Sequence, residues 1–267
     1  MKKFLSICLL SATIFSTNAQ QLKAFIENEK TGFMDKRTKE IVIKPIYDKD
    51  SYASFTKEGY AKVALNAKVG YINTNGATVI DFKYDGGDDF TQGFTFVRLN
   101  DKYALINLKG VLITTFKYDD RNGFQEYLGQ VKYKENWGFI DTAGKEIIVP
   151  QYESTYSFSQ GLATVKKNGK WGCIDKTGKV IIAIKYENSL LFGEEKNTTR
   201  VELNGKYGVI DRTGKEVIPI KYADVQGYGD NEKFVQFRGK WGAVNTEGKT
   251  TMPFIYATLR EIYDASK

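Results

Sequence analysis

Histidine is absent from all 267 residues of the chain. This absence removes the general base of Ser-His-Asp and Cys-His catalytic groups and the commonest zinc ligand. Carboxylate chemistry, such as glycoside hydrolysis by a pair of Asp or Glu side chains, is the main route left open. We therefore expect a protein that is not an enzyme, with no cofactor and no catalytic or metal-binding residues. The alternative is a glycoside-acting enzyme that depends on carboxylates.

Cysteine is almost as scarce, and the N-terminus decides what remains of it. A short basic start is followed by an apolar run at residues 4–15 and by small residues up to Ala19. This pattern is typical of a cleaved signal peptide, and the run is too short to cross a bilayer. We expect residues 1–19 to be removed, Cys8 with them, and the chain to be exported to the periplasm, the cell surface or the medium. Cys173 then has no internal disulfide partner, and its strand-like surroundings predict a small buried side chain.

The excess of positive over negative charge is also small. The net charge is +7, and it falls to +5 when Lys2 and Lys3 leave with the signal peptide. Such a mild excess favours weak attraction to anionic surfaces and is far from the signature of a nucleic-acid-binding protein. We expect no nucleic-acid partner and no transmembrane segment in the mature chain. Hydrophobic residues at 42% are sufficient for a folded core.

What the sequence does contain is one repeat in seven copies. An aromatic–glycine step, Trp171-Gly172 in the clearest copy, recurs with its second position spaced by 38, 34, 34, 34, 36 and 34 residues. A tyrosine follows fourteen residues later in every copy but the first, where it is one residue further on. These tyrosines are Tyr47, Tyr84, Tyr118, Tyr152, Tyr186, Tyr222 and Tyr256. A fixed period of this length is the mark of a tandem repeat architecture.

Each copy also predicts its own turns. Asn168-Gly169 stands between two strand-like runs, and Asn-Gly suits the two positive-φ positions of a type I′ turn. A two-residue loop fixes the register, so Ala163 should pair with Ile174. A second turn is expected at residues 175–178, where an Asp first and a Gly fourth suit turn geometry. Residues 180–186 should form a third strand, with a possible short fourth strand around residues 186–192.

Both faces of these strands carry apolar side chains, which favours sheets packed between like neighbours. The sequence therefore predicts an all-β fold of tandem β-meanders, residues 20–267 forming a single domain. We favour a seven-bladed β-propeller, and the alternative is an open β-solenoid or a twisted hairpin array. Trp171 should fill the seam between copies, with Gly172 leaving room for the neighbouring copy.

The phrase G-L-A-x-V-x-x-x-G-K-W-G-x-I-D-x-x-G-K, from Gly161 to Lys179, resembles the WG (or KWG) repeat family of bacterial proteins. The resemblance covers almost all of the mature chain and is weaker in the first three copies, where no tryptophan stands at the anchor. It implies a repeated β module that is often exported. It implies no catalytic residue.

Two polar features remain as candidate sites. The acidic loop at residues 85–89 reads as a solvated loop, and whether it binds calcium stays open because the spacing of an EF-hand is missing. Lysines recur at two registers, so the array should carry two basic edges. We expect a non-catalytic binding or scaffolding module outside the cytoplasm, whose partner is a protein or an envelope polysaccharide. The first edge, the candidate contact for an anionic partner, has the rim lysines Lys145, Lys179, Lys215 and Lys249, and the second has Lys102, Lys170, Lys206 and Lys240.

Overall fold

The computed structural model describes residues 21–193, 197–228 and 232–266, so the predicted signal peptide at residues 1–19 lies outside the described residues. The chain divides into two compact units. Unit 1 runs to Arg121 and includes Thr142–Gly144, and unit 2 contains Asn122–Asp141 and the chain from Lys145 onward. Among the described residues, no helix has the length and apolar character needed to span a membrane.

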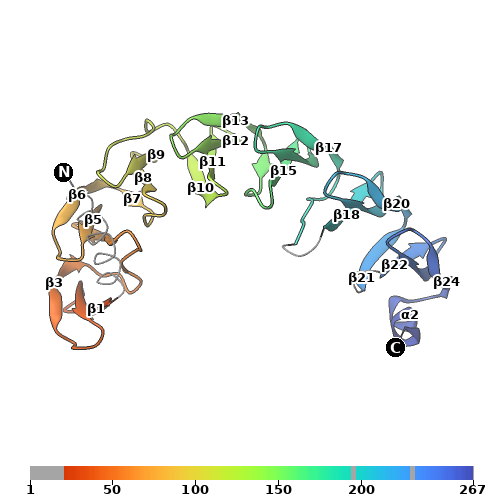
Figure 1. The fold of residues 1–267 in the computed structure, drawn as a ribbon, viewed down its shortest axis with the longest axis horizontal. Coiled ribbons are helices and arrows are strands. Elements are labelled where there is room, and N and C mark those ends of the chain that lie inside the picture. Colours follow the sequence, from red (N-terminus) through yellow and green to blue (C-terminus); the bar gives the residue numbers. More distant parts are fainter. Residues whose placement is uncertain (1–20, 194–196, 229–231, 267) are drawn as a thin grey trace, which may run out of the picture. The chain divides into compact units, whose positions relative to one another are not determined.

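Unit 1 contains three antiparallel sheets of three strands each, drawn in red to yellow in Figure 1. Each sheet is built from strands that follow one another in the chain. Sheet 1 has β1 (Leu22–Glu27), β2 (Lys30–Asp35) and β3 (Ile41–Asp48); sheet 2 has β4 (Tyr60–Leu65), β5 (Lys68–Asn73) and β6 (Thr78–Tyr84); sheet 3 has β7 (Gly86–Gly87), β8 (Phe94–Leu99) and β9 (Lys102–Asn107).

Unit 2 contains four more sheets and one short helix, drawn in green to blue; β10 begins two residues before its boundary. Sheet 4 has β10 (Asp120–Gln125), β11 (Leu128–Tyr133), β12 (Asn136–Asp141) and β13 (Glu146–Tyr152); sheet 5 has β14 (Ser154–Thr155), β15 (Leu162–Lys167), β16 (Lys170–Asp175) and β17 (Val180–Tyr186). Sheet 6 has β18 (Thr198–Leu203), β19 (Lys206–Asp211) and β20 (Glu216–Tyr222); sheet 7 has β21 (Asp224–Tyr228), β22 (Glu232–Phe237), β23 (Lys240–Asn245) and β24 (Thr250–Tyr256), and α2 (Leu259–Ala265) follows.

These sheets confirm the predicted all-β fold of tandem meanders. Asn168 and Gly169 have φ angles of 52° and 74°, as a type I′ turn requires, and Ala163 pairs with Ile174 as expected. The third strand, β17, spans the predicted residues. Seven sheets of blade size therefore stand in the described chain, as a seven-bladed propeller needs. The closure of these sheets into a ring stays a prediction.

The predicted fourth strand around residues 186–192 is not formed. Where a strand does follow the recurring tyrosine, as β14 follows Tyr152, it pairs with the first long strand of the next copy and not with the strand before it. After Tyr186, residues 187–193 form no strand at all. A two-residue strand such as β14 is set by its neighbour in space, which the local sequence does not reveal.

Glycine is needed in the aromatic–glycine step for a different reason from the predicted one. The register between β16 and β17 shifts on either side of Cys173, which marks a bulge. A Cβ on Gly172 would lie 2.6 Å from the carbonyl oxygen of Ile182 and 2.7 Å from the Cα of Ile184. Both atoms belong to the third strand of the same sheet, so this glycine admits the bulge and does not make room for a neighbouring copy.

The recurring tyrosine stands directly opposite the aromatic anchor, as in the pair Trp171 and Tyr186. In sheet 3 an alanine, Ala104, replaces the glycine of the step. There residues 111–118 form no regular strand and are joined to β9 by two isolated bridges. The bulged third strand and the glycine therefore occur together.

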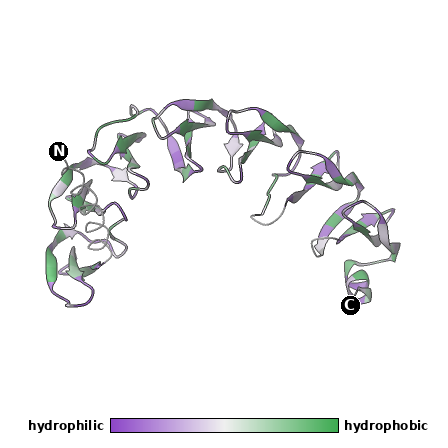
Figure 2. Ribbon diagram, in the orientation of Figure 1, coloured by the Kyte–Doolittle hydropathy of each residue, from purple (hydrophilic) through white to green (hydrophobic). Residues whose placement is uncertain are grey.

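Hydrophobic residues lie between successive sheets of each unit, and Figure 2 shows hydrophobic stretches in every sheet. In sheet 5, Val165 and Ile174 pack toward sheet 4, whereas Cys173 packs toward sheet 6. Trp171 is half-buried and packs against the second of these clusters, as predicted. The equivalent face of sheet 7 is covered by α2, whose Ile262 is fully buried.

Candidate functional site

The rim lysines all lie in unit 2, at the turn between the second and third long strands of sheets 4 to 7. The backbone of each turn is held by the acid or amide four residues earlier. Asp175 shows the geometry: its Oδ1 accepts hydrogen bonds from the amide of Thr177 at 2.9 Å and from the amide of Lys179 at 3.0 Å. Because Asn245 does the same for Lys249 at 2.9 Å, the side chain serves the turn and not acid chemistry.

All four rim lysine side chains are exposed, and none forms an ion pair within the described chain. Each lies on a different sheet, so the structure places them along one kind of turn and does not gather them into one patch. The turns also carry acids. Hydrogen bonds from Thr177 hold the pKa of Asp175 below its usual value, so that carboxylate stays charged beside Lys179. The edge is therefore of mixed charge, and each turn alone attracts an anion weakly.

The second predicted basic edge is in part neutralised. Lys170 pairs with Glu187 at 2.8 Å, and Lys102 pairs with Asp119. The acid comes directly after the tyrosine that recurs in each copy. Lys206 and Lys240 stay exposed, because alanine stands where the acid would be. The prediction of two equivalent basic edges is therefore wrong for this second register.

These acids also join successive sheets. Asp48 pairs with Lys30 at 3.0 Å and accepts a hydrogen bond at 2.8 Å from the amide of Ala67, in the hairpin turn of the next sheet. Glu187 likewise accepts one at 3.2 Å from the amide of Asn204. The hydrogen bonds from the amide of Ala67 and from Lys30 lower the pKa of Asp48, and those from Lys170 and the amide of Asn204 lower the pKa of Glu187. We refer to Asp48, Asp85 and Glu187, which share this geometry, as the clamp acids.

The acidic loop at residues 85–89 uses two of its carboxylates within unit 1. Asp85 pairs with Lys68 at 2.6 Å, and Asp88 pairs with Arg121. Burial raises the pKa of Asp88 although Arg121 opposes the shift. The two carboxylates therefore face different cationic side chains of the chain itself, and this explains the local cluster of acids without a bound ion.

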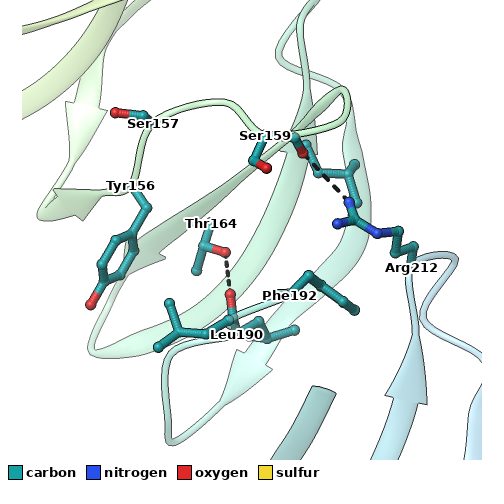
Figure 3. Close-up of a pocket in the computed structure, with 9 residues that line it drawn as sticks. Tyr156, Ser157, Ser159, Thr164, Leu190, Phe192 and Arg212 are labelled. Carbon is teal, nitrogen blue, oxygen red and sulfur yellow. Dashed lines mark hydrogen bonds between the residues drawn. The ribbon is translucent and has the colours of Figure 1, made fainter. Parts of the chain in front are cut away.

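One pocket in unit 2 combines a cation with apolar walls. It lies between sheets 5 and 6 and has a volume of about 150 Å³. The hydroxyl of Thr164 donates to the carbonyl of Leu190 at 2.5 Å, which fixes the segment that forms one wall. Figure 3 shows Arg212 entering from the β19–β20 turn, with one nitrogen directed at the carbonyl of Ser159. The lining residues labelled there are Tyr156, Ser157, Ser159, Thr164, Leu190, Phe192 and Arg212.

Sequence reasoning missed this pocket because its residues come from different copies. The signal that could have found it is Arg212, the arginine directly after the turn aspartate, where Lys36 and Lys176 or Thr142 and Thr246 stand in other copies. The described pocket is lined by no Asp or Glu side chain. Its chemistry is that of binding an anionic or hydroxylated group.

Cys173 lies behind Thr164, with 3.5 Å between the sulfur and the hydroxyl oxygen. The side chain is fully buried, as predicted. Burial raises the pKa of its thiol to about 11, so the thiol is protonated and a poor nucleophile at neutral pH.

The sequence matches the family model described as "WG containing repeat" over residues 32–68, 70–103, 137–171, 171–207 and 207–240. No curated protein matches the sequence. Similar solved structures include a eukaryotic initiation factor (10% identity, TM-score 0.45), and the match covers 86% of this chain and 73% of the initiation factor chain. Hsv2 from Kluyveromyces lactis (7% identity, TM-score 0.39) covers 85% and 90%, and the dihydro-heme d1 dehydrogenase NirN (11% identity, TM-score 0.41) covers 88% and 62%. All three TM-scores lie below 0.5.

Proposed function

The chain belongs to the family of proteins with the WG-containing repeat, and from this premise we propose that it is a non-catalytic binding module that works outside the cytoplasm. Its partner is an anionic component of the cell envelope, and the partner we propose is an acidic polysaccharide. The rim lysines make the contact. The observation that carries the proposal is the recurrence of one exposed lysine at the same turn of four successive sheets of unit 2.

The energetics of such a surface favour many weak contacts. An exposed ion pair contributes about 0–1 kcal/mol, and the acids within the turns reduce this further. Packed sheets lie about 10 Å apart, close to the Debye length of about 8 Å at physiological ionic strength. Neighbouring lysines therefore act nearly independently, and a polyanion that meets several of them gains affinity through multivalency.

The rim is tested by retention of the protein on envelope fractions. The wild type and the variant with Lys145, Lys179, Lys215 and Lys249 all changed to Gln are compared on anionic and neutral fractions, at about 0.05 and 0.5 M salt. We expect strong retention only for the wild type, on the anionic fraction, at low salt. Since the four side chains are exposed, the variant should melt at the wild-type temperature. Retention that changes neither with salt concentration nor with the four substitutions would refute the role of the rim lysines.

Export is tested by the mass of the protein recovered from its native cell. If residues 1–19 are a cleaved signal peptide, the mature chain begins at Gln20. A mass that includes residues 1–19, in a protein found in the cytoplasm, would contradict the proposed location.

The absence of catalysis is tested on the same glycans. Incubation with the retained polysaccharide should release no reducing ends. Hydrolysis that one Asp or Glu substitution abolishes would instead support a carboxylate-dependent glycoside hydrolase.

A further inference from the structure

Two successive seams of unit 2 differ in one charge. Between sheets 4 and 5, Lys176 follows the turn aspartate and pairs with Glu126 at 2.8 Å. Glu126 also accepts a hydrogen bond at 3.1 Å from the amide of Gly161. Between sheets 5 and 6, Arg212 occupies the position of Lys176, one residue after Asp211. The basic residue is kept from one seam to the next.

Its acidic partner is not kept. Glu126 stands two residues before Leu128, which pairs with Asp141, and Gln160 stands two residues before Leu162, which pairs with Asp175. Glu126 and Gln160 also share a positive φ, 52° and 51°. The two positions are therefore equivalent, and the carboxylate of the first seam is a neutral amide in the second.

The consequence is visible at the guanidinium group. Nη1 of Arg212 donates to the carbonyl of Ser159 at a long 3.4 Å. Nε and Nη2 are buried and have no hydrogen-bond partner in the described part of the chain. The guanidinium carbon lies over the ring of Phe192, 5.0 Å from the ring centroid. Buried, unpaired donors are unfavourable, more so on a charged group, so the guanidinium group of Arg212 lacks the acidic partner that Lys176 has in the preceding seam.

The pocket beside the guanidinium has room for one ring-sized group. Its volume of about 150 Å³ is small, and half-exposed Tyr156 offers an aromatic surface of the kind that stacks on a sugar ring. Ser159 lines the same pocket, and its hydroxyl can bind a ring hydroxyl. Ser157 donates to Gln130 at 3.3 Å, which fixes the loop on that side.

We propose that this pocket binds one uronic acid unit, with its carboxylate on Arg212 and its ring against Tyr156. An arginine fork and a carboxylate match in geometry, and the ligand supplies the negative charge that Glu126 supplies in the preceding seam. The inference rests on the proposed function, because it names the acidic sugar of the polysaccharide. It adds a specific site to the nonspecific attraction of the rim.

The test is to titrate the mature protein with glucuronate, glucose and acetate in turn and to measure each affinity by isothermal titration calorimetry. We expect glucuronate to bind at least about 10-fold more tightly than either comparison ligand, because only it engages both the guanidinium and the ring wall. Arg212→Gln should weaken glucuronate binding about 10-fold or more, and Arg212→Lys should restore part of the loss. Lys176→Gln is the matched control at the equivalent turn position and should bind as the wild type does.

Gln160→Glu is the reciprocal variant. It places an acid where Glu126 stands in the preceding seam, so the chain's own carboxylate should occupy Arg212 and exclude glucuronate. The same variant should melt at a higher temperature than the wild type. A Gln160→Glu protein that binds glucuronate normally would overturn the proposal, as would Arg212→Gln with unchanged affinity.

The outcome is separable from that of the rim. A monosaccharide cannot bridge several turns, so the variant with all four rim lysines changed to Gln should still bind glucuronate if the pocket is correct. Equal binding of acetate, or binding of an acidic peptide without binding of glucuronate, would overturn the assignment to a sugar. A rim variant that loses polysaccharide retention and still binds glucuronate would support the pocket, and one that loses glucuronate binding as well would overturn it.

Discussion

Gly172→Ala probes the structural rule of the repeat. The glycine does not have a positive φ, so alanine introduces no backbone strain of its own. The added Cβ would instead meet the carbonyl oxygen of Ile182 at 2.6 Å and the Cα of Ile184 at 2.7 Å. Both are backbone atoms of β17 and cannot rotate away, so the bulged strand must shift.

The expected loss is moderate. Overpacking of a well-packed site costs about 1–3 kcal/mol. Replacing a glycine also restricts the unfolded chain, which offsets about 0.4–1 kcal/mol. At roughly 2–4 °C per kcal/mol for a chain of this size, the melting temperature should fall by several degrees.

Gly123→Ala is the matched control in the same unit. No heavy atom lies within 4 Å of a Cβ at Gly123, and its φ is not positive. Both variants are followed by urea denaturation, with the midpoint compared at constant slope. If Gly172→Ala unfolds at the same urea concentration as Gly123→Ala, the proposed role of the bulge is wrong.

Three further outcomes are expected. Clamp acids such as Asp85 and Glu187 have lowered pKa values in the folded chain, so the stability that they contribute is full above the pKa of the unfolded chain and is lost as pH falls through the pKa of the folded chain. The urea midpoint should therefore be constant above about pH 5 and fall below about pH 4, and a midpoint that does not change with pH would contradict the role of the clamp acids. Cys173 should react with a thiol reagent at pH 8 only after unfolding, since burial raises its pKa to about 11, and rapid reaction of the native protein would refute its burial. Ile262→Ala should loosen α2 and shift Trp241 fluorescence to the red, whereas an unchanged spectrum would show that α2 does not cover that tryptophan.

The features that the sequence predicted correctly are local. Asn168-Gly169 fixes its turn through the φ angles that those residues tolerate, and the two-residue loop then fixes the pairing of Ala163 with Ile174. The third strand followed from its β-branched residues, and the turn role of Asp175 from its spacing. Each of these depends on residues within one copy.

The features that were missed depend on two copies or on a bulge. Gly172 was assigned to the seam because a strand pattern does not show where a register shifts. The ion pair of Lys170 does not follow from the local sequence, because its partner, Glu187, lies 17 residues away. The pocket at Arg212 is formed by residues of two copies, and the replacement of Glu126 by Gln160 gains its meaning only once the seam between the two sheets is known.

The most direct test of the proposed function is the salt dependence of binding to a purified uronic acid polysaccharide. The dissociation constants of the wild type and of the variant with all four rim lysines changed to Gln are measured from about 0.05 to 0.5 M salt. Each contact between a lysine and a carboxylate that releases a counterion makes the slope of log affinity against log salt concentration more negative by at most about 1. We predict a steep slope for the wild type and a clearly shallower one for the variant, with weaker binding at low salt. Equal slopes and equal affinities would contradict the account.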